Sequence, residues 1–231
     1  MYVANHFAME PDQVRALLAE VGAADLVTAH ESGMTATYLP FAFDAEAGDH
    51  GALLTHVARN NSQARDAVLG EALVIVHGAD HYVSPTWLPA LERSGQVVPT
   101  WNYLTVHAYG TLVVHDDPAW TRDVIERMTA AHEAQYHLDD VPPDFVERML
   151  RAIVGIEVRI TRIEAKAKMS QNKAPDDVTG IVSGLISRGD ADPDAEATAA
   201  WMQEHSLPAA QRRADLLADL AAARDARRHT T

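Results

Sequence analysis

Two hydrophobic periods divide this chain: a two-residue period, typical of β-strands, and a period near four, typical of helices. The two-residue period is bounded by glycine and acidic residues and predicts strands over 24–30, 34–44, 51–57, 71–78, 97–115 and 155–172. The longer period predicts helices over 11–22, closed by Gly22, and over 117–135, 142–152, 176–187, 194–205 and 207–228. We therefore expect an α+β fold in which a body of about six strands precedes a helical C-terminal portion, with a linker over 188–197.

In two of these strands the pattern of apolar residues predicts which faces are buried. Residues 71–78, EALVIVHG, are apolar at odd and even positions alike, which predicts burial on both faces of the sheet. In 97–115 one face is aliphatic, whereas the other carries Trp101, Tyr103, Thr105, His107 and Tyr109. That second face is aromatic and amphipathic, so it suits a ligand surface or an interface better than open solvent.

The last predicted strand changes parity along its length. Even positions are apolar at first, from Ile156 to Ile160, and odd positions are apolar from Ile163 onward. A β-bulge near Thr161–Arg162 would produce this change, because one extra residue turns every later side chain to the opposite face. Past the bulge, four polar side chains would share one face: Lys166, Lys168, Ser170 and Asn172.

The charge of the chain makes that polar face unusual. The formal net charge is −14, and all three lysines of the chain lie within 164–177. We refer to Lys166, Lys168 and Lys173 as the lysine cluster. A run of charges is most often a solvated surface, but this gathering favours a site for an anionic group such as a phosphate or a propionate. The acidic balance argues against direct nucleic-acid binding, whose affinity comes from cations that neutralise phosphates.

Composition narrows the class of protein further. The chain has no cysteine, which removes disulfides and thiolate metal sites and fits a cytoplasmic protein. No apolar run reaches the roughly 18 residues that a membrane helix needs, so no membrane partner is expected. The N-terminus lacks the basic and apolar regions of a secretory signal. The histidines show no helical pair with an intervening glutamate, so no metal site is predicted.

The stretch THVARNNSQAR offers one further group of candidate binding residues. His56, Arg59, Asn60 and Asn61 lie at an expected turn from a strand into a helix. Free backbone N–H groups at such a turn attract anions, and the side chains add cationic and amide donors. The structural alternative is that Asn60 or Asn61 caps the helix while Arg59 is solvated.

Two other stretches offer candidates of the same kind. Ser84 precedes Pro85 and could contribute a hydroxyl to a ligand, or it could be the N-cap of a short helix. Trp101 and Asn102 could stack on a planar ligand and hydrogen-bond to it. A buried tryptophan beside an asparagine that bonds within the protein is the alternative.

Six motifs, taken in order, resemble the PaiB family, whose members are labelled FMN-binding negative transcriptional regulators. They are MYVANHFAM, HVARNN, GEALVIVHGADHYVSPTW, VVPTWNYLTVHAYG, LRAIVGIEV and KAKMSQNK. The resemblance implies an FMN-binding split β-barrel of mainly antiparallel strands over residues 1–188, and the helical extension predicted over 189–231 falls outside the resemblance. It also implies a homodimer with the cofactor at the subunit interface and a small-molecule substrate or effector.

The resemblance also implies which residues bind the cofactor. Carried over by motif, they are His56, Arg59, Asn60, Asn61, Ser84, Thr100, Trp101, Asn102, Lys168, Ser170 and Gln171. Arg59 and Lys168 would contact the FMN phosphate, and Trp101 would lie beside the flavin ring. No catalytic acid or base is identified, since FMN supplies its own reactive atom and the protein mainly positions it. The implied function is that of a flavin-dependent oxidoreductase or a regulator.

Two other functions stay open at this point. Some PaiB-like members, the piperazate synthases, bind haem b and form an N–N bond in N5-hydroxyornithine. In that case His56 would be the axial ligand, and Arg59 or the lysine cluster would hold the propionates. The family label also implies a DNA-binding transcriptional repressor, against which the net charge argues.

Overall fold

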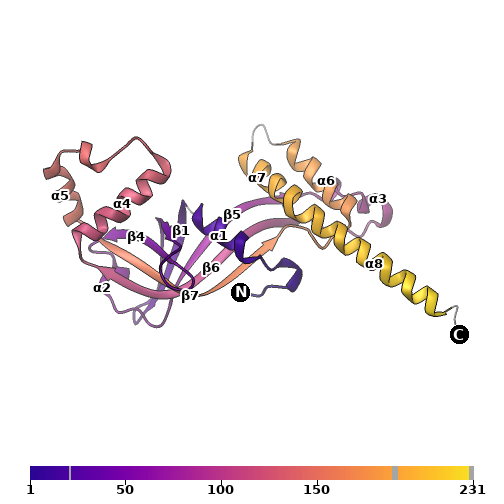
Figure 1. Cartoon of the computed structure of the whole chain (residues 1–231), viewed down its shortest axis with the longest axis horizontal. Coiled ribbons are helices and arrows are strands. Elements are labelled where there is room, and N and C mark those ends of the chain that lie inside the picture. The colour runs from indigo at the N-terminus through magenta and orange to yellow at the C-terminus, as the bar shows by residue number, and fades with distance from the viewer. Residues whose placement is uncertain (21, 189–191, 229–231) are drawn as a thin grey trace. The chain divides into compact units, whose positions relative to one another are not determined.

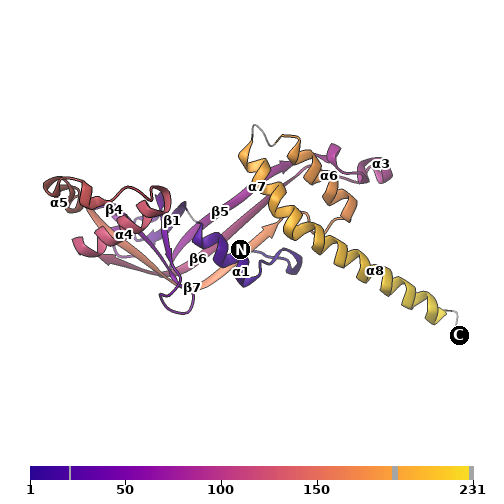
Figure 2. The ribbon, with the colours of Figure 1, turned by 45° about the horizontal axis from the view of Figure 1, so that its top comes forward.

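The computed structural model describes residues 1–20, 22–188 and 192–228 of the chain. Within these residues seven strands form one sheet in the order β2-β1-β5-β6-β7-β4-β3 (Figures 1 and 2). They are β1 (Ala23–His30), β2 (Gly33–Pro40), β3 (Ala42–Asp44), β4 (Ala52–Ala58), β5 (Ala72–Val83), β6 (Thr100–His115) and β7 (Ile153–Lys168). The pairings of β1 with β2 and β5, and of β4 with β3 and β7, are all antiparallel.

Helices flank this sheet and follow it along the chain. The α-helices are α1 (Pro11–Ala19), α2 (Ser62–Arg65), α3 (Ala90–Ser94), α4 (Pro118–His132), α5 (Pro143–Arg151), α6 (Pro175–Ile186), α7 (Pro193–Trp201) and α8 (Leu207–Arg228). Short 3-10 turns form η1 (Asn5–Phe7), η2 (Pro85–Trp87) and η3 (Leu138–Asp140), and a π-helical turn, η5 (Met202–Ser206), joins α7 to α8. Proline stands in the first turn of α1, α4, α5, α6 and α7, where its missing N–H would have no partner in any case.

The chain packs into two compact units. Unit 1 consists of Met1 with residues 10–76 and 106–165, and unit 2 consists of residues 2–9, 77–105 and 166 onward. Strands β5, β6 and β7 contribute residues to both units. The predicted boundary near residue 188, between a split barrel and a helical extension, stays a prediction.

The strands of unit 1 carry its core, and β4 is buried on both faces, since the consecutive residues Leu53 and Leu54 are both buried. Leu26, Leu53 and Ile156 are fully buried in this core. Helix α4 packs on this unit through Val124 and Met128, which form a cluster with Ala52 and Leu54 of β4. The alternation of buried and half-buried residues along β1 shows why a two-residue hydrophobic period identifies such strands.

The core of unit 2 is built mainly from helices. Met169, Ile181, Leu185 and Met202 are fully buried. Helix α6 approaches η2 so closely that a Cβ at Gly180 would lie 2.1 Å from the carbonyl oxygen of Trp87. Only glycine therefore fits at this contact.

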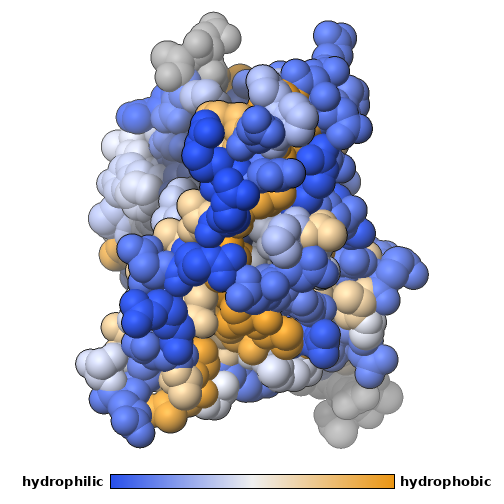
Figure 3. Space-filling model, turned by 90° about the vertical axis from the view of Figure 1, so that its left-hand side faces the viewer, coloured by the Kyte–Doolittle hydropathy of each residue, from blue (hydrophilic) through white to orange (hydrophobic). Residues whose placement is uncertain are grey.

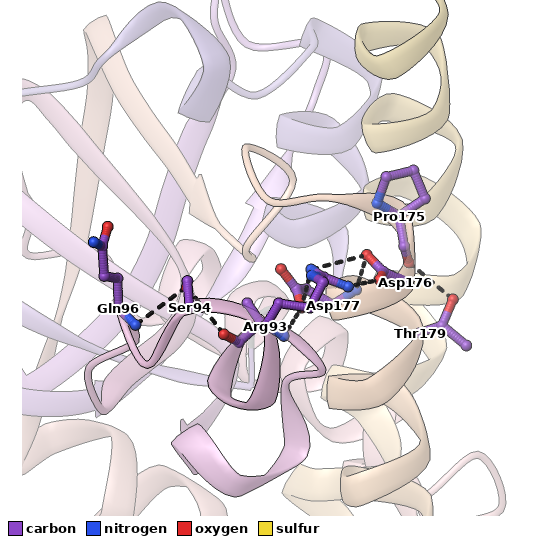
Figure 4. Close-up of polar contacts among 8 residues, drawn as sticks. Arg93, Ser94, Gln96, Pro175, Asp176, Asp177 and Thr179 are labelled. Carbon is purple, nitrogen blue, oxygen red and sulfur yellow. Dashed lines mark hydrogen bonds and ion pairs between the residues drawn. The ribbon is translucent and has the colours of Figure 1, made fainter.

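Polar contacts join α3 to the start of α6 within unit 2. A carboxylate oxygen of Asp177 accepts from the backbone N–H of Ala90 at 2.8 Å and from Arg93 at 3.1 Å. Arg93 also forms an ion pair with Asp176, and Figure 4 shows its guanidinium beside both aspartates. Because α6 begins two residues after Lys173, these contacts fix the chain just past the lysine cluster.

Each of the six predicted strands is found as a strand, with differences at their ends and one division that makes seven. The predicted strand 34–44 is two strands, β2 and β3, separated at Phe41. The predicted strand 155–172 ends at Lys168, and the chain then turns, with the N–H of Lys173 donating to the carbonyl oxygen of Ser170 at 3.0 Å.

Burial confirms the change of parity in β7. Val154, Ile156, Val158 and Ile160 are buried at even positions, whereas Ala167 and Met169 are buried at odd ones. The bulge proposed to cause this change stays a prediction.

The prediction for 71–78 is wrong on one face. Ala72, Val74 and Val76 are buried, but Leu73 and Ile75 are half-buried. Their partners on β1, Val27 and Asp25, are half-buried too, so this side of the sheet is only partly covered. Apolar residues on both faces of a strand therefore do not establish a second complete layer.

Three helix boundaries also differ from the prediction. Helix α1 ends at Ala19, short of Gly22, which lies just before β1, and Val21 lies outside the described residues. The predicted linker over 188–197 is helical from Pro193, because Asp192 caps α7 by accepting from a backbone N–H, and residues 189–191 lie outside the described range. The predicted helix 194–205 is α-helical only to Trp201 and continues as the π-helical turn η5.

The surface carries some exposed large hydrophobic side chains. On α5, Phe145 and Met149 are 46% and 49% exposed. Figure 3 shows hydrophobic areas interrupting the polar surface on the face that it presents. Phe145 and Met149 lie one helical turn apart, and an exposed pair of this size does not by itself indicate a partner. In the described part of the chain, no helix combines the length and apolar character needed to cross a bilayer.

Candidate functional site

Lys168, the last residue of β7, reaches the beginning of β6 within unit 2. Its Nζ donates to the hydroxyl oxygen of Thr100 at 2.5 Å and to the carbonyl oxygen of Trp101. Both acceptors are neutral, so these contacts position the ammonium group without neutralising it. Two of the residues predicted to bind a cofactor therefore lie together with Lys168.

The ring of Tyr103 lies against two members of the lysine cluster. The ammonium groups of Lys166 and Lys168 are 5.6 and 5.8 Å from its centre, which is the range of a cation–π contact. The two-residue spacing of these lysines places both on one face of β7, as the hydrophobic pattern predicted.

The lysine cluster has no carboxylate to balance it. Among the residues that the structure describes, no Asp or Glu lies within ion-pair distance of Lys166, Lys168 or Lys173. Several arginines do have such partners, among them Arg93, Arg122 and Arg127. Partial burial lowers the pKa of the Lys168 amine, and the charges of Lys166 and Lys173 lower it further. A bound anion would counter the repulsion among these three cations.

An exposed aromatic surface belongs to the same unit. The side chain of Trp101 is 51% exposed, and its indole N–H donates to a carboxylate oxygen of Asp80 at 2.6 Å. Tyr82 meets the indole edge-on, with ring centres 6.2 Å apart. The hydrogen bond and the ring contact fix the orientation of Trp101 while a large part of the indole stays open to a planar ligand.

Three predicted site residues direct their side chains to partners within the protein. The buried hydroxyl of Ser170 donates to Oδ1 of Asn102 at 2.9 Å. The Gln171 amide donates to the carbonyl oxygen of Ala167 and accepts from the N–H of Met169. Asn102 and Gln171 thus hold the backbone that follows β7, and this role differs from direct contact with a ligand.

Ser84 has the structural role that its sequence context offered as an alternative. Its side chain accepts from the backbone N–H of Thr86 at 3.3 Å and caps the 3-10 turn η2. The hydroxyls of Ser84 and Thr86 are also 2.8 Å apart.

The other predicted residues belong to unit 1. Arg59 is held by three contacts: an ion pair with Asp116 at 2.7 Å and hydrogen bonds to the carbonyl oxygens of Arg151 and Ile153. The positive charge of Arg59 is therefore already balanced by the carboxylate of Asp116. Asn60 is exposed.

Asn61 caps α2. Its side chain accepts from the N–H of Gln63 at 2.9 Å. The Gln63 side chain is fully buried and donates to the carbonyl oxygen of Leu26 and the hydroxyl of Thr28, both at 3.0 Å. The cap therefore anchors a buried polar network, which accounts for Asn61 without a ligand.

His56 differs from these three residues because one ring nitrogen has no partner. Its Nδ1 is buried and forms no hydrogen bond. Burial lowers the pKa of the imidazole, so the ring is neutral at pH 7. A buried neutral imidazole with a free nitrogen has the chemistry of a metal or haem ligand.

The structure thus gathers Lys168, Thr100 and Trp101 at one place and joins Asn102 to Ser170 beside it. That His56, Arg59, Asn60 and Asn61 contact the same ligand stays a prediction. Tyr103 and Lys166 were not among the cofactor-binding residues carried over from the family motifs, although they belong to the predicted aromatic face and to the lysine cluster. The two-residue period of their strands was the signal that could have found them, since each lies two positions from a predicted residue.

In the described part of the chain, no three His, Asp or Glu side chains gather as a bound metal ion would require.

The fold defines a class of protein: an antiparallel sheet with flanking helices, of the split-barrel type. A protein of Mycobacterium tuberculosis, conserved hypothetical protein Rv2991, matches it with a TM-score of 0.53 at 12% identity, over 75% of this chain and 94% of the other. The flavocytochrome Anf3 from Azotobacter vinelandii matches with a TM-score of 0.51 at 15% identity, over 72% of each chain. Identities this low show the fold alone.

The sequence places the chain within a family of this class. Residues 1–162 match the family described as "Putative FMN-binding domain", and the chain belongs to that family. Protease synthase and sporulation protein PAI 2 of Bacillus subtilis is 28% identical over 209 residues, which are 88% of this chain and 97% of that protein. Uncharacterized protein AN0679 of Emericella nidulans is 30% identical over 66% of this chain and 75% of its own length. The predicted resemblance to the PaiB family is confirmed.

Proposed function

We propose that this PaiB-like protein binds FMN and that the lysine cluster, with Thr100, holds the FMN phosphate. The observation that carries the proposal is the set of three ammonium groups with no carboxylate partner in the described residues of an otherwise acidic chain. A phosphate dianion supplies the missing negative charge, and charge-assisted hydrogen bonds of this kind are strong.

The side chains present fit the two parts of FMN. Lys168 and Thr100 already lie within hydrogen-bond distance of each other, so one phosphate oxygen could contact both. The exposed indole of Trp101 offers a flat surface to the isoalloxazine ring. Bound FMN would supply hydride or single-electron chemistry, and the protein would orient the ring and exclude water from it.

Comparison of FMN with riboflavin tests this assignment, because the two differ only in the phosphate. We expect wild-type protein to quench FMN fluorescence on binding and to bind riboflavin much more weakly. Lys168→Gln should weaken FMN binding by about tenfold to a hundredfold, as expected for the loss of a charge-assisted contact, and should leave riboflavin binding unchanged. Equal affinities of the wild type for the two flavins would overturn the proposal.

A matched control separates the site from the overall charge. Arg15 is exposed on α1 and also carries one positive charge. Arg15→Gln changes the net charge by the same amount as Lys168→Gln. If both variants lose the same affinity for FMN, the effect is long-range and the lysine cluster is not the phosphate site.

A homodimer and a cytoplasmic location belong to the same proposal. The family resemblance supports a dimer with the cofactor between subunits, and the lack of cysteine supports a reducing compartment. Sedimentation velocity with and without FMN tests the dimer. A monomer that binds FMN with full affinity would exclude a cofactor site that needs two subunits.

The haem alternative has one observation in its favour, the buried and unpartnered Nδ1 of His56. If the protein binds haem b, this neutral imidazole is the candidate axial ligand. Protein purified from cells supplied with a haem precursor would then show a Soret band. A His56→Ala variant with an unchanged Soret band would exclude His56 as the ligand.

A further inference from the structure

The turn after β7, which carries Lys173 of the lysine cluster, contains a residue in an unusual backbone conformation. Ser170 has a φ of 61°, and among the described residues it is the sole non-glycine residue with a positive φ. A left-handed serine costs conformational energy and persists only where surrounding contacts hold it. The turn it creates is closed by the hydrogen bond from the Lys173 N–H to the Ser170 carbonyl.

Buried side chains hold this turn from the β6 side. Ser170 donates its hydroxyl proton to Oδ1 of Asn102 at 2.9 Å, and Nδ2 of Asn102 donates to the sulfur of Met202 at 3.3 Å. Ser170, Asn102 and Met202 are all buried. The side-chain oxygen and nitrogen of Asn102 therefore each have a partner within the protein.

The C-terminal helices hold the same turn from the other side. Ser206 is fully buried and donates to the carbonyl oxygen of Met169 at 2.7 Å, directly before Ser170. Arg213 on α8 donates to the carbonyl oxygen of Asn172 at 3.2 Å, directly before Lys173. The turn is thus bonded on both sides of its strained residue.

Met202 and Ser206 are the first and last residues of the π-helical turn η5. A π-helical turn widens the helix by one residue and is often found at functional sites. Met202, at one end of η5, contacts Asn102, which in turn bonds to Ser170, and Ser206, at the other end, bonds to the carbonyl oxygen of Met169. Both ends of η5 therefore hold the start of the lysine-bearing turn.

We propose that η5, through Ser206 and the Asn102–Ser170 pair, positions Lys173 and Lys168 to bind one phosphate together. Ser206, Asn102 and Ser170 are positioning residues rather than ligands, since their side chains are buried and bonded to one another or to backbone. The inference rests on the proposed function, because the phosphate in question is that of FMN. It adds that the predicted helical extension contributes to the binding site.

The test measures the ratio of the dissociation constant for riboflavin to that for FMN, because this ratio isolates the contribution of the phosphate. Ser206→Ala removes one hydroxyl from a helical position and should lower the ratio by about tenfold, with riboflavin binding unchanged. A purely structural role would weaken the binding of both flavins equally, and the ratio would stay the same. That result would overturn the inference.

A pair of neighbouring exposed arginines gives a second measurement that does not depend on a buried substitution. Arg213→Gln removes the contact with Asn172, whereas Arg212→Gln removes the same charge from an exposed position on the same helix. We expect Arg213→Gln to lower the ratio severalfold more than Arg212→Gln. Equal effects would contradict the inference. A wild-type ratio near one would overturn the proposed function itself, and the inference with it.

Discussion

Replacing Asp177 by alanine should destabilise the protein far more than the same change at Asp176. The two aspartates are adjacent in the first turn of α6 and both contact Arg93 (Figure 4). The side chain of Asp177 is 9% exposed, and that of Asp176 is 50% exposed. Asp177 also accepts from the N–H of Ala90 at 2.8 Å, in a partly buried contact.

The magnitude follows from what each change leaves behind. Without Asp177 the Ala90 N–H loses its acceptor, and an unsatisfied buried donor costs about 1–3 kcal/mol. Without Asp176 a solvent-exposed ion pair is lost, and such pairs contribute little. The Asp177 N–H also loses its acceptor at 2.9 Å, but it lies in the first turn of a helix beside an exposed side chain, where water can replace that acceptor. Both changes remove one negative charge from the N-terminus of α6, so the contribution of the helix dipole cancels in the comparison.

Thermal unfolding followed by tryptophan fluorescence measures this difference, since Trp87 packs against α6. We expect Asp177→Ala to lower the midpoint by roughly 2–12 °C for a chain of this size and Asp176→Ala to lower it much less. Asp177→Asn keeps an acceptor for Ala90 and should give an intermediate value. A loss for Asp176→Ala equal to or greater than that for Asp177→Ala would refute the reasoning.

Three further predictions concern other parts of the chain. Burial lowers the pKa of His56 in the folded protein, so the unfolded state takes up a proton at a higher pH than the folded state does. His56 should therefore reduce the stability of the fold as the pH falls below about 6.5. Urea unfolding at pH 7 and 5.5 should show a smaller loss of stability for His56→Gln than for wild type. Gly110→Ala would place a Cβ 2.2 Å from a carbonyl oxygen of β7 and should lower the free energy of unfolding by about 1–3 kcal/mol or more. Gly22→Ala is the control, because its Cβ would lie 3.7 Å from the nearest atom, and it should leave the free energy of unfolding in urea nearly unchanged. Lys166→Gln removes a neighbouring positive charge and should raise the pKa of Lys168. NMR titration of the lysine side-chain carbons measures this pKa, and an unchanged pKa would show that the two ammonium groups do not interact.

The positions of the strands along the chain could be predicted because most have a two-residue hydrophobic period, and because 71–78 is a short apolar run ended by a glycine. The ends of the elements could not, because they depend on local contacts outside that period. Helix α7 begins at Pro193 because the Asp192 side chain accepts from the Ala195 N–H, within a stretch whose composition is typical of a linker. The half-buried face of Leu73 likewise depends on β1, which is distant in sequence.

The candidate site was predictable in part for the same reason. The spacing of Lys166 and Lys168 placed them on one strand face, and the structure confirms it through their common contact with Tyr103. Sequence could not distinguish ligand-facing from structural side chains in KMSQN. Ser170 and Gln171 bond to Asn102 and to backbone, and these contacts depend on a left-handed residue that no hydrophobic period indicates.

The region of the chain that defines the family is not the region that carries the proposed phosphate site. The family match covers residues 1–162, whereas the lysine cluster lies between 166 and 173, beyond that match. Membership of the family therefore does not by itself place the phosphate on Lys168, and the argument for that residue comes from its unbalanced charge and its contact with Thr100. If Lys168→Gln leaves FMN affinity intact while the wild type still prefers FMN to riboflavin, the phosphate is bound elsewhere. In that case Arg59, which the family motif also supplies, becomes the next cation to test, and it would have to leave Asp116 to take part.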